Sequence, residues 1–223
     1  MKKIIFMLTT LFLLSACTNG KKAENTQSVT VEDTPDSSFQ YSVDKFADVE
    51  ILRYYVPGFK SLSLKQKELI YYLNQAALEG RDILWDQNNR YNLSIRRLCE
   101  TLYQNFAGDK TSEDWKNFEM YLKQIWMANG IHHHYSEDKI MPKFSQDVFV
   151  SMIKSIDATL LPFGDETLNE ILPVMFDPNV MPKRMNQASG ADLVKTSAVN
   201  FYEGVTQKQV EDFYTKMKNP NDT

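Results

Sequence analysis

The pattern of apolar and polar positions along the chain predicts a series of helices separated by polar breaks. Ser63-Leu64-Lys65-Gln66 has the form of a capping box, in which a serine and a glutamine satisfy the first free backbone N–H groups of a helix. Leu69 and Leu73 follow at helical spacing on one face, and Gly80 supplies a stop. A second helix is expected to begin at Asn92, which can act as its N-cap.

Three more helices are predicted downstream. Thr111–Asp114 places acidic residues in the first turn of a helix that Asn129-Gly130 ends. Ser145-Gln146-Asp147 begins a fourth helix, and Thr206–Gln209 is a second capping box that begins the last one. The apolar stripe of the third helix, which is expected to be core, consists of Trp115, Phe118, Leu122 and Ile125.

Other segments have weaker patterns. Phe46–Phe59 is expected to be an extended lead-in or a short helix, and the polar segment 81–91 is expected to turn the chain around a single apolar anchor, Trp85. Pro173 should kink or end a short helix, and 186–204 suits one or two strands or an exposed loop. Helix signals dominate and no set of strands is large enough for a complete sheet. The expected fold class is therefore mainly α with minor β.

Composition narrows the class of protein. Apolar residues make up 43% of the 223 residues, which is enough for a real core and excludes a wholly disordered chain. The net charge is −4, and no basic stripe with interleaved aromatic residues occurs, so no nucleic-acid partner is expected. Cys17 and Cys99 are the only cysteines. Cys99 lies on a predicted helix far from any histidine, and a buried apolar role is favoured over a reactive thiol.

The first forty residues predict export and a lipid anchor. Residues 1–16 combine two lysines with an apolar run shorter than the roughly 20 residues that span a bilayer, which is typical of a signal peptide. Leu14-Ser15-Ala16-Cys17 resembles the lipobox of bacterial lipoproteins, in which the cysteine is acylated after cleavage; the alternative is an ordinary signal peptide with a chance cysteine. Residues 17–40 are expected to be the lipidated cysteine and a flexible tether, and 41–223 the folded part. The expected partner is the membrane, and the expected location is the cell envelope (periplasm or outer membrane).

All three histidines of the chain, His132, His133 and His134, directly follow Asn129-Gly130. In an extended segment His132 and His134 would point to one face and could bind zinc, with Glu137 or Asp138 as a third ligand. The alternatives to a metal site are a loop that faces a substrate or supports the fold, and a solvated connector between two helices. The H-E-x-x-H spacing, a glycine-rich phosphate loop and a G-x-S-x-G elbow are all absent from the sequence, so no catalytic residue is assigned.

Three blocks resemble the N-terminal part of bacterial dipeptidyl peptidase III: 46–85, then 126–142 (WMANGIHHHYSEDKIMP), then 192–214. That family consists of two-lobed zinc exopeptidases that remove dipeptides from peptide N-termini. The resemblance implies that this chain is the N-terminal part of the lower lobe and that 129–135 runs near the cleft. It also implies that Tyr135 is at a position where the family places an aromatic residue that contacts substrate.

The zinc-binding motif of that family, a helical H-E-x-x-G-H with a later glutamate, does not occur in this chain. Zinc is therefore the expected cofactor of the full-length family, and none is expected for this chain alone, which should be inactive by itself. Peptides are the expected partner once the lobe is completed. The alternative function is a lipoprotein that binds peptides or metal without catalysis.

Overall fold

The computed structural model describes residues 34–218 of the chain. The predicted signal peptide, Cys17 and most of the predicted tether lie outside the described residues. Of the part expected to fold, 41–223, residues 41–218 are described and 219–223 lie outside.

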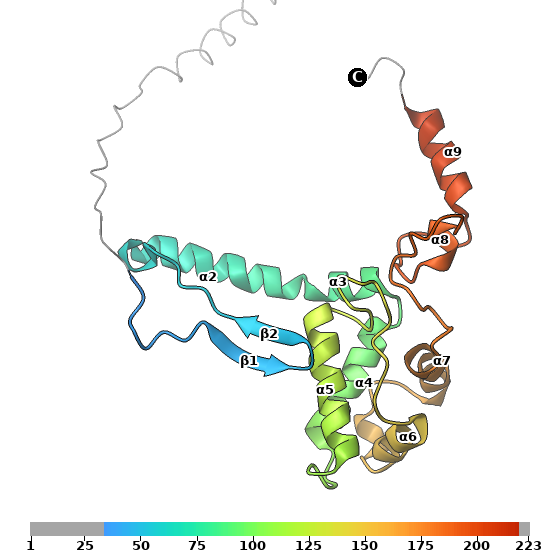
Figure 1. Cartoon of the computed structure of the whole chain (residues 1–223), viewed down its shortest axis with the longest axis horizontal. Helices are drawn as coiled ribbons and strands as arrows, with labels where there is room; N and C mark the ends of the chain where they lie inside the picture. Colours follow the sequence, from blue (N-terminus) through green and yellow to red (C-terminus); the bar gives the residue numbers. More distant parts are fainter. Residues whose placement is uncertain (1–33, 219–223) are drawn as a thin grey trace, which may run out of the picture. The chain divides into compact units, whose positions relative to one another are not determined.

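The chain divides into two units. Among the described residues, the smaller one includes 34–39 together with 56–61, where η1 (Phe59–Ser61) forms a single turn. The larger one includes 40–55 and the chain from residue 62 onward, and it contains the sheet, the α-helices and the core (Figure 1). Its elements are β1 (Ser42–Phe46), β2 (Val49–Leu52), α2 (Leu64–Glu79), α3 (Arg81–Asn88), α4 (Asn92–Asn105), α5 (Glu113–Ala128), α6 (Gln146–Lys154), η2 (Ala158–Leu160), α7 (Asp165–Phe176), α8 (Leu193–Thr196) and α9 (Gln207–Met217). The predicted class, mainly α with minor β, is confirmed.

Side-chain caps fix the starts of most of the predicted helices. Both hydrogen bonds of the capping box are present at Ser63 and again at Thr206, and Ser112 and Ser145 accept from the N3 backbone N–H of their helices. Asn129 has left-handed backbone angles and ends α5, as predicted. Polar residues thus set the starts of α2, α5, α6 and α9.

The small sheet is a hairpin of β1 and β2. Phe46 pairs with Val49 and Lys45 with Glu50, so Ala47 and Asp48 form the two-residue turn, with φ of +48° at Ala47. The extended lead-in expected from Phe46 onward is β2, while β1 lies in a segment for which no strand is predicted. An Ala-Asp turn has none of the glycine or asparagine signals that usually mark such hairpins, which is why the sequence does not reveal it.

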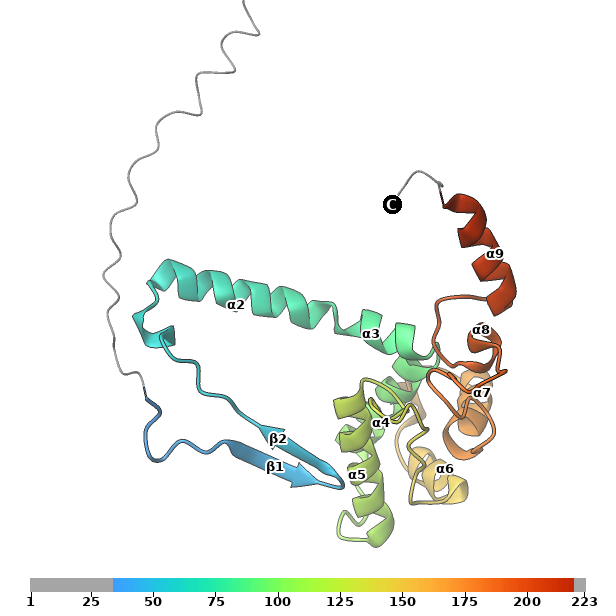
Figure 2. The same ribbon diagram turned by 45° about the horizontal axis from the view of Figure 1, so that its top comes forward.

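The core of the larger unit is built on α4 and α5, which lie side by side (Figures 1 and 2). The predicted stripe of α5 is buried, and it packs with Leu98 and Leu102 of α4. Aromatic rings extend the core toward α6 and α7, where Phe149 contacts Phe144 and Phe176 at centroid distances of 5.8 and 5.7 Å. Cys99 is also buried in this core, and burial raises the pKa of its thiol.

Residues 81–91 do not simply turn the chain. Residues 81–88 form helix α3, because the anchor Trp85 is fully buried and its packing outweighs the polar character of its neighbours. Arg96 of α4 covers the Trp85 ring with its guanidinium 5.2 Å from the ring centroid. Helix α3 therefore contributes one residue, Trp85, to the core, and three residues separate its end from the start of α4.

Of the alternatives expected for two other segments, the structure excludes a helix end at Pro173 and strands in 186–204, and it agrees with a loop in 186–204. Helix α7 continues through Pro173 to Phe176, because Ile171, Leu172, Val174 and Met175 are all buried and favour the helical path over the loss of one backbone hydrogen bond. Residues 186–204 form no strand; Asp192 caps the short helix α8 by accepting from Val194 N and Lys195 N, and the rest is loop.

Helix α2 buries none of its side chains against other described residues. Leu69 and Leu73, which share the apolar face predicted from the sequence, are 59% and 60% exposed. Tyr71 and Tyr72 are exposed as well, with their rings packed edge to face at 5.3 Å. Within residues 34–218, no helix has both the length and the apolar character needed to cross a bilayer.

Candidate functional site: the histidine loop

The histidine loop, residues 129–142, leaves the C-terminus of α5 through a tight backbone contact. Gly130 N donates to Ile125 O at 3.0 Å, and φ of Gly130 is +149°. The side chain of Asn92, buried at the start of α4, donates to Trp85 O and accepts from Ile131 N. Asn92 therefore does not cap its own helix, as the sequence suggests, but holds the beginning of the loop.

His132 points into the protein. Its side chain is only 2% exposed, and its Nε2 lies 2.8 Å from Met181 O. Because a carbonyl oxygen can only accept, Nε2 carries the proton, and Nδ1 of the neutral ring has no hydrogen-bond partner among the described residues. His132 thus joins the loop to the segment around Met181 and is not available to solvent.

His133 and His134 lie at the surface together with Tyr135. The rings of His133 and His134 are 4.7 Å apart, and those of His134 and Tyr135 are 4.3 Å apart. Nδ1 of His133 accepts from the backbone N–H groups of Tyr135 and Ser136, so its Nε2 carries the proton and lies 3.6 Å from Asp48 Oδ2. The three rings form a small aromatic ledge, in which Tyr135 is 84% exposed.

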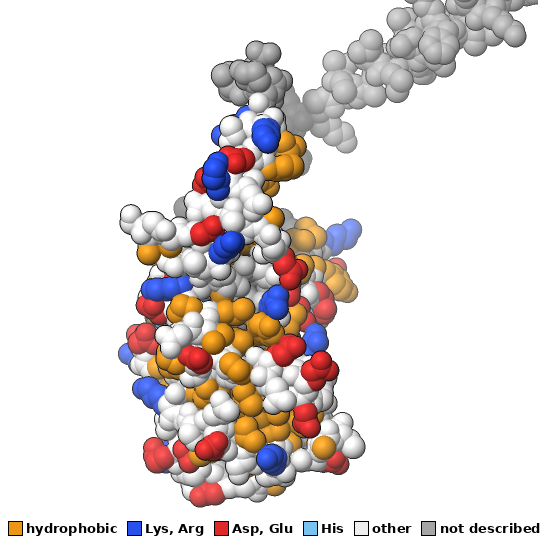
Figure 3. Space-filling model, turned by 90° about the vertical axis from the view of Figure 1, so that its right-hand side faces the viewer, with side chains coloured by type: hydrophobic (Ala, Val, Ile, Leu, Met, Phe, Trp, Pro, Cys, Tyr) orange, Lys and Arg blue, Asp and Glu red, His pale blue; other side chains and the backbone are white. Residues whose placement is uncertain are grey.

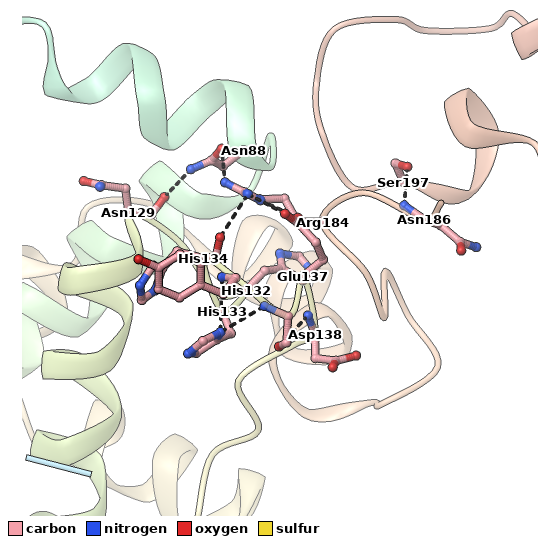
Figure 4. Close-up of polar contacts among 12 residues, drawn as sticks. Asn88, Asn129, His132, His133, His134, Glu137, Asp138, Arg184, Asn186 and Ser197 are labelled. Carbon is pink, nitrogen blue, oxygen red and sulfur yellow. Dashed lines mark hydrogen bonds and ion pairs between the residues drawn. The ribbon is translucent and has the colours of Figure 1, made fainter. Parts of the chain in front are cut away.

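An ion pair supports the loop from the other side (Figure 4). Arg184 binds Glu137 with two hydrogen bonds of 2.7 Å, from Nε to Oε2 and from Nη2 to Oε1. The same guanidinium reaches Asn88 Oδ1 of α3 and His134 O, and Arg184 N donates to Glu137 O. Glu137 has a positive φ of +64°, and the double contact with Arg184 holds this backbone in place and keeps the pKa of Glu137 low.

Two lysines complete the attachment of the loop. Lys183 Nζ lies 2.5 Å from Asp138 Oδ1. Lys139 Nζ donates to the carbonyl oxygens of Asp177 and Val180, and partial burial lowers the pKa of this amine. The histidine loop is therefore fixed along its length to residues 177–184, with the aromatic ledge left facing outward.

The structure does not bring the two candidate zinc ligands together. His132 is buried with Nε2 engaged by Met181 O, whereas His134 is exposed. Glu137, a candidate third ligand, is occupied by Arg184. Among residues 34–218, no group of three His, Cys, Asp or Glu side chains is placed to hold a metal ion, so these side chains do not fit a zinc site.

The residues that organise the loop are not the ones that the sequence singles out. Asn92, Met181 and Arg184 lie 39 or more positions away in the chain from the loop atoms they contact. Their roles follow from tertiary packing, and no local motif marks them. Tyr135 and the histidines, by contrast, are conspicuous in the sequence itself.

Comparison with known proteins adds no assignment: no protein-family model matches this chain, and no curated protein matches it.

Burial of His132 predicts a loss of stability in mild acid. Burial lowers its pKa, Lys139 and Arg184 lower it further, and the contact with Met181 O and the charge of Glu137 partly oppose this. The unfolded chain then binds a proton near the ordinary value of about 6.5 while the folded chain does not. The free energy of unfolding should be constant above that pH and fall below it, by at most about 1.4 kcal/mol per pH unit, until the folded pKa is reached.

Urea unfolding from pH 8 to pH 5 tests this pH dependence. His132→Gln should flatten the acid loss relative to the wild-type protein, and His134→Gln, a change at the exposed ledge, should leave it unchanged. The prediction is wrong if NMR shows that His132 titrates like a histidine in an unstructured peptide.

Proposed function

We propose that this chain is a lipid-anchored part of the lower lobe of a dipeptidyl peptidase III-like exopeptidase, and that the histidine loop contributes Tyr135 to its peptide-binding cleft. The observation that carries the proposal is the aromatic ledge: Tyr135 is 84% exposed on a loop that Arg184, Lys183 and Lys139 hold rigidly. A rigid loop that presents an exposed aromatic ring is suited to binding a ligand, because little side-chain freedom is lost on contact.

Exposed apolar surface on the helices supports the assignment to part of a larger lobe. Besides α2, helix α9 buries no side chain, and Phe213, Tyr214 and Met217 are 58%, 53% and 65% exposed. Figure 3 shows hydrophobic side chains spread over the surface on the side of the molecule that carries the C-terminal helices. Such surface usually marks a site that another chain segment or partner covers.

In this proposal the chain supplies peptide contacts and not the hydrolytic centre. Members of the family use zinc to activate water for peptide-bond hydrolysis, and the side chains described here do not fit that ion. The zinc ligands would come from polypeptide outside this sequence. Within the chain, Tyr135 offers a ring face and a hydroxyl to a bound peptide, and Arg184 and Glu137 keep its loop in position.

The lipid anchor belongs to the same proposal. Acylation of Cys17 would place the protein in the cell envelope (periplasm or outer membrane), with residues 18–40 as the tether. Cys17→Ser should move the exported protein from the membrane fraction to the soluble fraction, and retention in the membrane would contradict the role of the thiol.

The peptidase assignment is tested on the gene and on the protein it encodes. An in-frame continuation that encodes H-E-x-x-G-H supports the proposal, and a stop codon directly after Thr223 contradicts it. In the longer protein, Tyr135→Ala should raise KM for a dipeptidyl-naphthylamide by about tenfold, the effect of losing one aromatic contact of roughly 1.4 kcal/mol. Tyr54→Ala removes a tyrosine of similar exposure, 75%, and should leave KM unchanged. The 223-residue chain alone should show no turnover with zinc added.

A second candidate function is peptide capture without cleavage. The same exposed ledge favours it, since an aromatic ring on a fixed loop can bind a peptide without any catalytic group. Measurable affinity of the 223-residue chain for peptides, lost in Tyr135→Ala and retained in Tyr54→Ala, would favour this candidate over the peptidase lobe.

A further inference from the structure

A cavity of about 480 Å³ lies in the C-terminal part of the larger unit, and no residue of the aromatic ledge lines it. The loop after α8 forms one wall of it, and Arg90 and Met181 contribute from other parts of the chain. Ligand sites for small molecules have volumes of roughly 300–1,000 Å³. The cavity is therefore large enough for a molecule of amino-acid size.

Backbone hydrogen bonds hold the walls of the cavity in place. Ala198 N and Val199 N both donate to Arg184 O, at 3.0 and 3.2 Å, and Asn200 N donates to Gln87 O at 2.8 Å. Met181 is fixed from two sides, because its carbonyl accepts from His132 and its sulfur lies 3.3 Å from Asn89 Nδ2. The cavity is thus preformed, and Met181 in its lining also contacts His132 of the histidine loop.

Opposite charges stand side by side at this cavity. Arg90 Nη1 lies 3.4 Å from Glu203 Oε1, and both side chains keep much of their exposure, 52% and 87%. The Arg90 guanidinium is oriented by Tyr91, since it lies 5.1 Å from the ring centroid and donates to the hydroxyl at 3.1 Å. Lys195 adds a second positive charge to the lining. A partly solvated pair of this kind is weak and can exchange its partners for those of a ligand.

The rest of the lining includes apolar surface, from Val194, Val199 and Val205 together with Met181. A ligand that matches the cavity has a carboxylate for Arg90 and Lys195, an ammonium group for Glu203 and an apolar body. The two charged groups must be close to each other, because Arg90 and Glu203 are adjacent. The α-carbon of a free amino acid carries both groups at that separation.

We propose that this cavity binds a free α-amino acid with an apolar side chain. On binding, the Arg90–Glu203 pair opens, Arg90 and Lys195 take the carboxylate, Glu203 takes the ammonium, and the valines contact the side chain. The ion pairs that Arg90 and Glu203 form with the ligand replace the pair that they form with each other, so neither charge is left without a partner. The proposal is independent of a peptidase role, since it uses none of the residues of the aromatic ledge.

L-leucine titrated into the 223-residue chain is the probe, followed by NMR of ¹³C-labelled methionine methyl groups. The Met181 signal, assigned by its loss in Met181→Leu, should shift and saturate. N-acetyl-L-leucine lacks the ammonium and L-leucinamide lacks the carboxylate, and each should bind at least about tenfold more weakly, the effect of one charge-assisted hydrogen bond. This comparison needs no variant and so does not depend on how a substitution affects folding.

Charge-removing variants provide the second test. Arg90→Gln and Glu203→Gln should each weaken L-leucine binding about tenfold. Arg97→Gln is a matched control, because Arg97 of α4 is 57% exposed and pairs with Asp82 of α3 at 3.6 Å. Glu113→Gln is the matched acidic control, at 83% exposure and 3.0 Å from Lys116. Both controls should bind L-leucine as the wild-type chain does.

Three results would overturn the proposal. The first is the absence of any saturable Met181 shift with L-leucine at tens of millimolar. The second is equal binding of L-leucine and N-acetyl-L-leucine, which would make the cavity a site for carboxylates in general. The third is unchanged binding in both Arg90→Gln and Glu203→Gln.

Discussion

Replacing Gly130 by alanine should lower the free energy of unfolding by about 3 kcal/mol. A Cβ atom at this position would lie 2.9 Å from Cγ of Asn92 and closer still to its Nδ2, inside the contact that holds the start of the histidine loop. The backbone also has φ of +149°, a region that residues other than glycine rarely adopt. Overpacking costs roughly 1–3 kcal/mol and backbone strain a similar amount, and the two effects act together here. Urea denaturation followed by tryptophan fluorescence measures the change.

Gly190→Ala is the matched control for this substitution. Gly190 also has a positive φ, +80°, but a Cβ atom there would meet nothing within 4 Å. Its cost should be about 1 kcal/mol, from backbone strain alone. If the two variants lose the same stability, the contact between Gly130 and Asn92 is not a close approach, and the account of the loop entrance is wrong.

Arg184→Met should destabilise the protein by about 2 kcal/mol. The change leaves the Glu137 carboxylate without its double hydrogen bond while both side chains are mostly buried, at 22% and 24% exposure. Breaking a fully buried ion pair by removing one partner costs roughly 3–5 kcal/mol, and the remaining solvent access reduces that figure. The loop should also become more mobile around Tyr135, which NMR relaxation of its backbone amide would detect.

Lys208→Met tests whether this effect depends on burial. Lys208 Nζ lies 2.8 Å from Asp212 Oδ2, but the two side chains are 80% and 52% exposed, so the loss of stability should be much smaller than that of Arg184→Met. Acid provides a further check, because Arg184 lowers the pKa of Glu137. The stability from this pair is present above the ordinary glutamate pKa of about 4.3 and is lost as the pH falls below it, so the wild-type protein and Arg184→Met should converge in acid.

Helix starts and core stripes could be predicted from the sequence because each depends on residues close together in the chain. Ser63 with Gln66, and Thr206 with Gln209, satisfy each other's backbone groups within one turn. The stripe of α5 repeats every three or four residues and is buried as its period indicates. Interactions between residues close in the chain determine these helix starts and buried stripes, so the sequence pattern is enough to predict them.

Features decided by distant contacts could not be predicted in the same way. Helix α3 depends on the burial of Trp85 by α4, and α7 passes through Pro173 because four of its side chains are buried by other elements. Helix α2 could be predicted from its apolar spacing, but that spacing does not indicate whether its apolar face is buried, and no side chain of α2 is buried by the described residues. In the candidate site, the sequence indicates the histidines and Tyr135 but not which of them face inward. That difference is set by the contacts of the loop with Met181 and Arg184.

The burial of Cys99 has a consequence for the reactivity of its thiol. Its sulfur is enclosed by α4 and α5, so oxidants and alkylating reagents have no route to it while those helices stay packed. The rate at which this thiol reacts is therefore limited by how often α4 and α5 separate. Labelling of Cys99 by an alkylating reagent therefore measures the rate at which the core opens in the native protein.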